Sequence, residues 1–167
     1  MTLALLFVAA LAAQRLFELA ISKRHAEALR ARGAIEHGQG HFPLLVLVHV
    51  LLLAGIVFEV IVLGARPPAS WPAWAALFLA GQLLRYAAIR ALGPFWNVRV
   101  LVVPGAPLVR TGPYRFLRHP NYVAVVMELV AAPLIFGAWR TALAVSALNA
   151  LALWVRIRCE ERALTTP

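Results

Sequence analysis

Two clusters of polar side chains border apolar segments of this chain, and their residue types can bind or activate a ligand. The first cluster occupies residues 111–122 and combines cations, an imidazole and phenols: Tyr114, Arg115, Arg118, His119 and Tyr122. Pro120 suits the first turn of a helix, so we expect a helix N-terminus here. Such a terminus attracts carboxylate or phosphate groups. A basic anchor among lipid headgroups, with aromatic neighbours, is the structural alternative for the same residues.

The second cluster is the charged segment 156–162, at the end of the last apolar stretch. Arg156 and Glu160 are four residues apart, so they share a helix face and can pair or hold one ligand between them. A simple surface ion pair is the alternative, and it would contribute well under about 1 kcal/mol. The spacing alone leaves both interpretations open.

The carboxylate of Glu128 lies within the apolar segment 122–136, about 9 Å of helix beyond Tyr122. Ionisable groups at membrane depth are candidate functional groups. We therefore expect Glu128 to be a general base that takes a proton from the substrate, with His49 and Arg85 as partners that bind the substrate. An ion pair between Glu128 and Arg85 that serves only the fold is the equal alternative.

Several common cofactor and metal motifs are absent from the sequence. It contains no Gly-x-Gly-x-x-Gly pattern and no P-loop, so a nucleotide-like cofactor must bind in another way. His37 and His41 have helical spacing, but Gly38 and Gly40 interrupt it, which favours a polar loop over a metal site. Cys159 is the only cysteine, so no intrachain disulfide can form. We expect no metal ion.

The composition predicts a membrane protein. Of 167 residues, 62% are hydrophobic and 14% charged, which leaves too little polar surface for a soluble domain. Segments 2–21, 42–63, 71–92 and 140–155 approach or exceed the length of about 20 apolar residues that crosses a bilayer, and segment 122–136 is a shorter fifth. The first segment lacks the basic start of a signal peptide, so we expect it to be retained. Residues 1–167 are predicted to form a single membrane-embedded domain.

The basic residues predict how the chain is oriented. The formal net charge is +9, and twelve of the sixteen basic residues follow the first, third and fifth apolar segments. By the positive-inside rule, these connections and the C-terminus are cytoplasmic, and the N-terminus is outside. Anionic lipid headgroups account for this charge, so no nucleic-acid partner is required.

The two cytoplasmic connections, residues 22–41 and 93–120, are the long ones. The second contains β-branched runs broken by Pro104, Gly105 and Pro107, so it cannot be one helix. The predicted fold is therefore an all-α integral membrane protein, with five transmembrane helices and an irregular cytoplasmic connection before a C-terminal helical hairpin.

The two polar clusters, in this order, resemble the isoprenylcysteine carboxyl methyltransferase family, whose members end with Arg-His-Pro-x-Tyr, a helical hairpin and Arg-Ile-x-x-Glu-Glu. The matching part of this chain is about residues 92–164. The N-terminal half resembles a bacterial branch that methylates alkylresorcinols and alkylpyrones, through Gln14-Arg15-Leu16-Phe17-Glu18-Leu19, Arg32-Gly33-Ala34-x-Glu36 and His41-Phe42-Pro43 with His49. This resemblance implies a bacterial inner-membrane protein.

The resemblance also implies S-adenosyl-L-methionine as the cofactor and a set of residues that bind it: Leu108, Val109, Tyr114, His119, Pro120, Asn121, Tyr122 and Glu160. It places Arg156 on the acceptor side, as a catalytic and substrate-binding residue. Three positions depart from the eukaryotic pattern, because Arg99 stands where Gln is usual, and Ala106 and Pro107 replace the start of a His-x-Leu-Val segment.

The predicted activity is transfer of a methyl group to a lipophilic acceptor at the cytoplasmic face, either the hydroxyl of a long-chain phenol or pyrone or a prenylcysteine carboxylate. Membrane lipids are the other expected partners, and nothing in the sequence specifies an oligomeric state. The string from Arg118 to Tyr122 also occurs in NADPH-dependent membrane sterol and steroid reductases, which makes a reductase the leading alternative. A transporter or non-enzymatic membrane subunit would leave both clusters without a purpose.

Overall fold

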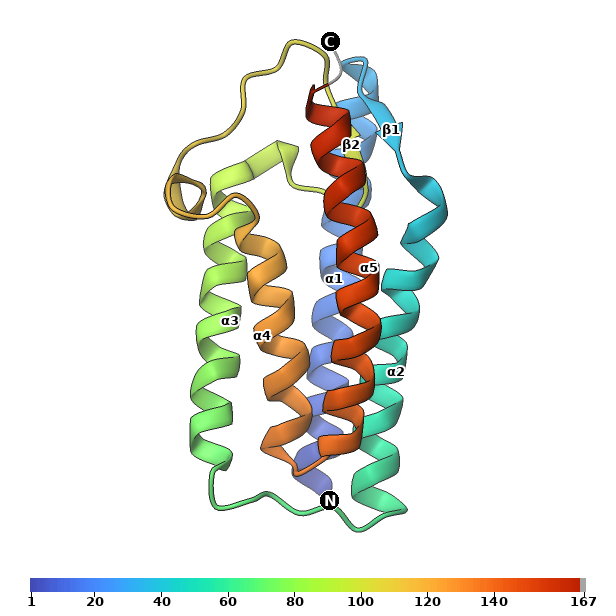
Figure 1. The fold of residues 1–167 in the computed structure, drawn as a ribbon, viewed down its shortest axis with the longest axis vertical. Helices are drawn as coiled ribbons and strands as arrows, with labels where there is room; N and C mark the ends of the chain where they lie inside the picture. Colours follow the sequence, from blue (N-terminus) through green and yellow to red (C-terminus); the bar gives the residue numbers. More distant parts are fainter. Residues whose placement is uncertain (166–167) are drawn as a thin grey trace.

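The computed structural model describes residues 1–165, apart from the side chains of His41 and Thr165. Within these residues the chain forms an up-and-down bundle of five helices (Figure 1): α1 (Thr2–Ala31), α2 (Phe42–Ile61), α3 (Trp71–Leu92), α4 (Pro120–Ile135) and α5 (Trp139–Thr165). Among these helices, α1, α2, α3 and α5 are long and apolar enough to cross a membrane. The predicted all-α membrane fold is confirmed.

Helix α4 is shorter, because its 16 residues span only about 24 Å. It packs mainly against α3 and α5, and half of its residues are buried. Small residues allow this close packing: a Cβ added at Gly81 of α3 would lie 3.2 Å from Met127 Cβ and 3.3 Å from Glu128 Cγ. Helix α4 therefore brings Glu128 and Tyr122 into the interior of the bundle, with the bilayer outside.

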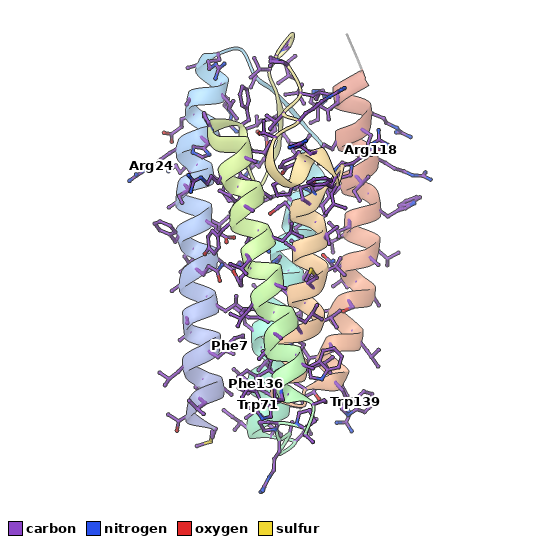
Figure 2. All side chains as sticks on the ribbon, turned by 90° about the vertical axis from the view of Figure 1, so that its left-hand side faces the viewer. Phe7, Arg24, Trp71, Arg118, Phe136 and Trp139 are labelled. Carbon is purple, nitrogen blue, oxygen red and sulfur yellow. The ribbon has the colours of Figure 1, made fainter. Side chains whose placement is uncertain are left out.

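The two ends of the bundle differ in their side chains. Figure 2 shows Trp71 and Trp139 near one end, with Phe7 and Phe136 nearby, and Arg24 and Arg118 toward the other end. At the aromatic end, Glu59 of α2 is only 3% exposed. It accepts hydrogen bonds from Thr141 N (2.5 Å) and Thr141 Oγ1 (2.6 Å). This carboxylate caps the first turn of α5 and joins it to α2.

The two long connections meet at the basic end. Strand β1 (Ile35–His37) from the first pairs antiparallel with β2 (Val100–Val102) from the second, with Glu36 opposite Leu101. The short 3-10 helices η1 (Gln39–His41), η2 (Gly93–Phe95) and η3 (Gly112–Arg115) complete these connections. The second connection is irregular, as predicted, but the pairing between the two connections was not anticipated.

The orientation in the membrane is a prediction that cysteine labelling can test. On a Cys159→Ser background, Arg115→Cys at the basic end should resist a membrane-impermeant thiol reagent in intact cells, and Ala69→Cys at the aromatic end should react. Both positions are exposed. The charge distribution predicts this result through the positive-inside rule. The reverse labelling pattern would show that the N-terminus is cytoplasmic.

Candidate active site at the basic end of the bundle

A cavity of about 520 Å³ lies at the basic end of the bundle, which is within the usual size range of ligand pockets, roughly 300–1,000 Å³. Its walls come from the end of α3, strand β2, residues 103–110, the first turn of α4 and the last turns of α5. Arginines and glutamates share these walls: Arg99, Arg110, Arg118, Arg156, Glu160 and Glu161. A ligand here would meet charges of both signs.

A hydrogen-bonded chain through Tyr122 joins α4 to α5 on the wall of this cavity. Arg156 Nε donates to Tyr122 Oη at 2.8 Å, and the Tyr122 hydroxyl donates to Glu160 Oε2. Arg156 and Glu160 do share one helix face, but in place of pairing directly they hold the phenol between them. Because Arg156 is only 6% exposed, its charge acts in a largely desolvated setting.

His119 extends this arrangement. Its ring stacks on that of Tyr122, with centroids 5.3 Å apart and an angle of 13° between the planes. Its two ring nitrogens lie near carboxylates, Nδ1 at 4.0 Å from Glu160 Oε1 and Nε2 at 3.5 Å from Glu161 Oε1. Burial, and to a lesser extent the charge of Glu160, raises the pKa of the Tyr114 phenol, so this hydroxyl stays protonated at neutral pH.

The C-terminal part of α1, at the basic end of the bundle, holds one wall of the cavity in place. Ser22 is 2% exposed; its Oγ donates to Asn97 Oδ1 (3.0 Å) and accepts from Val98 N (3.0 Å), while Asn97 Nδ2 donates to Ser22 O (2.8 Å). His25 Nδ1 lies 2.8 Å from Trp96 O. These bonds fix the segment that leads into β2. Sequence reasoning missed Ser22 and Asn97; the available signal was a small polar residue on the buried face of α1.

An ion-pair cluster connects the two long connections beside β1 and β2. Glu36 accepts hydrogen bonds from Arg99 Nη1 (2.6 Å) and Arg30 Nη2 (2.7 Å), and Arg99 Cζ also lies 4.6 Å from the Phe42 ring centroid. Arg99 lines the cavity, so Glu36 orients a cavity cation from a different part of the chain. Arg99, which stands where Gln is usual, therefore has a hydrogen-bonding partner within this chain.

The Glu36 cluster predicts a pH-dependent stability. The Arg99 hydrogen bond, with a smaller contribution from Arg30, holds the pKa of Glu36 below its ordinary 4.5, although burial opposes the shift. A depressed folded-state pKa stabilises the fold above pH 4.5, and this contribution is lost as the pH falls through the folded-state value. The stability difference between the parent and Glu36→Gln should therefore be constant near pH 7 and shrink on acidification. A difference that grows on acidification in pH-resolved melting experiments would contradict this.

The structure brings most of the expected cofactor-site residues onto the walls of this large cavity. These are Leu108, Val109, Tyr114, His119, Asn121, Tyr122 and Glu160, together with Arg156 on the expected acceptor side. Ala106 and Pro107, which depart from the eukaryotic pattern, also line it. Pro120 does not: it is buried as the first residue of α4, where it shapes the wall without facing the cavity.

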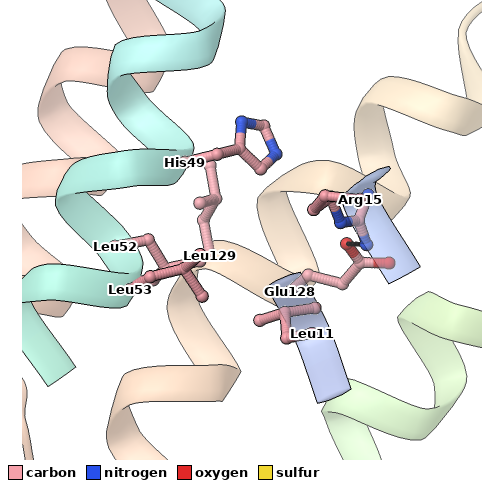
Figure 3. Close-up of a pocket in the computed structure, with 7 residues that line it drawn as sticks. All are labelled: Leu11, Arg15, His49, Leu52, Leu53, Glu128 and Leu129. Carbon is pink, nitrogen blue, oxygen red and sulfur yellow. Dashed lines mark hydrogen bonds and ion pairs between the residues drawn. The ribbon is translucent and has the colours of Figure 1, made fainter. Parts of the chain in front are cut away.

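The expected base and its partners lie elsewhere. Glu128 accepts hydrogen bonds from Arg85 Nε (2.7 Å), Arg85 Nη2 (2.5 Å) and Arg15 Nη2 (3.0 Å), and Arg15 Nη1 donates to Glu18 (2.8 Å). None of these residues lines the large cavity, and His49 instead borders a separate small cavity beside Glu128 (Figure 3). The structure shows the ion pair between Glu128 and Arg85 that was the alternative interpretation, and the role of Glu128 as a general base stays a prediction. The active site that we propose therefore does not depend on Glu128, His49 or Arg85.

Three polar atoms of cavity-lining residues are buried without a hydrogen-bond partner in the described part of the chain. They are the indole Nε1 of Trp96, the imidazole Nε2 of His119, which has only the ion-pair contact at 3.5 Å with Glu161, and the amide Oδ1 of Asn121. Buried polar groups are normally paired, so unpaired ones beside a cavity indicate a site built for a polar ligand. Among the described residues, no group of three or more His, Cys, Asp or Glu side chains could hold a metal ion.

The apolar helices define an integral membrane protein, and the cavity with charges of both signs at the basic end of the bundle is its candidate binding site. The family model described as isoprenylcysteine carboxyl methyltransferase (ICMT) matches residues 74–166, which include α4, α5 and the whole second connection. The chain belongs to this family and is a membrane methyltransferase.

Two relatives extend the similarity to the N-terminal half. YpbQ of Bacillus subtilis (strain 168), described as an uncharacterized protein, is 39% identical over 159 residues, which cover 95% of each chain. A protein of Haemophilus influenzae, also described as uncharacterized, is 30% identical over 158 residues, covering 94% of this chain and 92% of its own. Both alignments are long enough to include α1 and α2.

Proposed function

We propose that the large cavity binds S-adenosyl-L-methionine and that the enzyme transfers the methyl group to an oxygen of a lipophilic acceptor. The observation that carries this proposal is the chain Arg156–Tyr122–Glu160, which lies in a cavity of cofactor size where α4 and α5 reach the membrane boundary. A polar sulfonium donor and a lipid acceptor have to meet at such a boundary. The family of the chain supports the same chemistry.

The residues present fit this cofactor. Its amino-acid end carries an ammonium and a carboxylate, and its sulfur is cationic, so it requires charges of both signs; Glu160 and Glu161 supply one sign and the cavity arginines the other. The unpaired Trp96 Nε1 and Asn121 Oδ1 match polar edges of its nucleoside. When bound, it supplies an electrophilic methyl group. Glu160, Tyr114 and the 119–122 segment would hold it.

The protein residues then have to orient the acceptor and exclude water. Arg156 uses Nε to hold Tyr122, and its charge favours the ionised form of an acceptor hydroxyl beside it, which releases its proton to water before the methyl group is transferred. Strand β2 and residues 103–110 form part of the cavity wall, and in this proposal they help to exclude water from the reaction. Positioning and desolvation carry most of the catalysis in this proposal, since no residue of the described cavity has to form a covalent bond.

The acceptor in this proposal is the hydroxyl of a long-chain phenol or pyrone, and a prenylcysteine carboxylate is the second candidate. Purified enzyme in lipid vesicles, incubated with methyl-labelled donor, should label alkylresorcinol or alkylpyrone, as resolved by thin-layer chromatography. Arg156→Ala should lower this labelling strongly. The matched control is Arg158→Ala, because Arg158 is exposed and packs on Trp154 outside the cavity. Robust labelling of farnesylcysteine with none of the phenol or pyrone would overturn the acceptor class.

A further inference from the structure

A second, much smaller cavity lies deep in the bundle between α1, α2 and α4. Its volume is about 10 Å³, close to the space that one water molecule requires. Four leucines and three polar side chains line it, the latter being Arg15, His49 and Glu128 (Figure 3). A purely apolar cavity of this size would stay empty, but a cavity with three polar walls has groups that need partners.

The first of these groups is an unpaired donor. Arg15 uses Nη1 for Glu18 (2.8 Å) and Nη2 for Glu128 (3.0 Å), but its Nε is buried and has no hydrogen-bond partner among residues 1–165. A guanidinium nitrogen can only donate. The cavity therefore requires an acceptor near Arg15 Nε that the described chain does not supply.

The other two groups are acceptors. His49 Nδ1 lies 2.8 Å from Leu45 O, and because a carbonyl only accepts, Nδ1 carries the hydrogen. In the neutral imidazole, Nε2 is then an acceptor, and Figure 3 shows the ring and Arg15 pointing toward one another. Glu128 Oε1 accepts one bond, from Arg85 Nε (2.7 Å), so it retains a lone pair.

We propose that one water molecule occupies this cavity, accepting a hydrogen bond from Arg15 Nε and donating to His49 Nε2 and Glu128 Oε1. The occupant has to accept one bond and donate two. A hydroxyl group of a substrate has one hydrogen, and an ammonium ion has no acceptor, so neither fits. Three hydrogen bonds are the usual number for a buried water. The water joins α2 to the charged groups of α1 and α4, and it gives His49 a role that does not depend on the methyl acceptor.

Nitrogen NMR of isotope-labelled histidine in lipid bilayers tests this directly, with His49→Gln used to assign the His49 signals. We expect His49 to be neutral with hydrogen on Nδ1, and its Nε2 to receive magnetisation from water protons. A protonated Nε2, or an Nε2 without any transfer from water, would overturn the proposal.

Two substitutions provide an independent measurement. The amide oxygen of His49→Gln can still accept from the water, whereas His49→Leu fills the site with apolar atoms and leaves Arg15 Nε unpaired. The melting temperature of His49→Leu should therefore be lower than that of His49→Gln by about 3 °C or more. If the cavity is dry, His49→Leu should melt at the same temperature as His49→Gln or higher, and that result would also overturn the proposal.

Discussion

Glu128→Gln should lower the melting temperature of the purified protein more than any single substitution on the exposed surface. The substitution removes the carboxylate that Arg85 and Arg15 both contact. The guanidinium of Arg85, which is 3% exposed, and the guanidinium of Arg15 then share the single carboxylate of Glu18. Breaking a buried ion pair by removing one partner typically costs about 3–5 kcal/mol, because the remaining charge stays desolvated. For a chain of this size, that loss corresponds to roughly 10 °C in Tm.

A double variant separates this effect from a general loss of packing. Glu128→Gln combined with Arg85→Gln removes one charge of each sign, so its Tm should be higher than the two separate losses predict. Any loss of turnover in Glu128→Gln, measured where the variant is folded, should be the same for every acceptor. If the loss instead grows as the acceptor hydroxyl becomes less acidic, while Tm is unchanged, Glu128 is a general base and the structural interpretation is wrong.

Glu160→Ala should give the largest loss of cofactor affinity. Hydrogen bonds to charged groups contribute about 1.5–3 kcal/mol, so binding of S-adenosylhomocysteine should weaken about 10- to 150-fold. Tyr122→Phe should give a smaller loss, because the ring still stacks on His119 while the bridge from Arg156 to Glu160 is broken. Calorimetric titration in the same detergent measures the affinity of the parent, Glu160→Ala and Tyr122→Phe for S-adenosylhomocysteine.

Glu27→Ala is the control for this series, since Glu27 is exposed on the C-terminal part of α1 and does not line the cavity. Its affinity for S-adenosylhomocysteine should equal that of the parent. If Glu160→Ala binds as tightly as Glu27→Ala, the assignment of Glu160 to the cofactor is incorrect.

Much of the fold could be predicted from the sequence because the bilayer imposes a simple rule. A segment that crosses hydrocarbon has to be apolar and helical, so hydropathy alone located the five helices to within a few residues, except that α1 and α5 continue beyond the membrane. The start of α4 at Pro120 was predictable for a local reason, since proline suits the first helical turn.

The contacts between distant segments were not predictable in this way. Strands β1 and β2 have three residues each, too few to show an alternating pattern, and their pairing depends on how α1 and α3 place the two connections. Helical spacing put Arg156 and Glu160 on one face, but only the packing of α4 against α5 places Tyr122 between them. For Glu128, burial was predictable, whereas the choice between a base and an ion pair depended on the positions of Arg85 and Arg15.

The most direct test is a calorimetric titration of the purified parent protein with S-adenosylhomocysteine and, separately, with NADPH. A cofactor cavity formed by α4, α5 and the second connection predicts one S-adenosylhomocysteine site per chain and no binding of NADPH. Saturable binding of NADPH together with no binding of S-adenosylhomocysteine would contradict the proposed cofactor and favour a reductase.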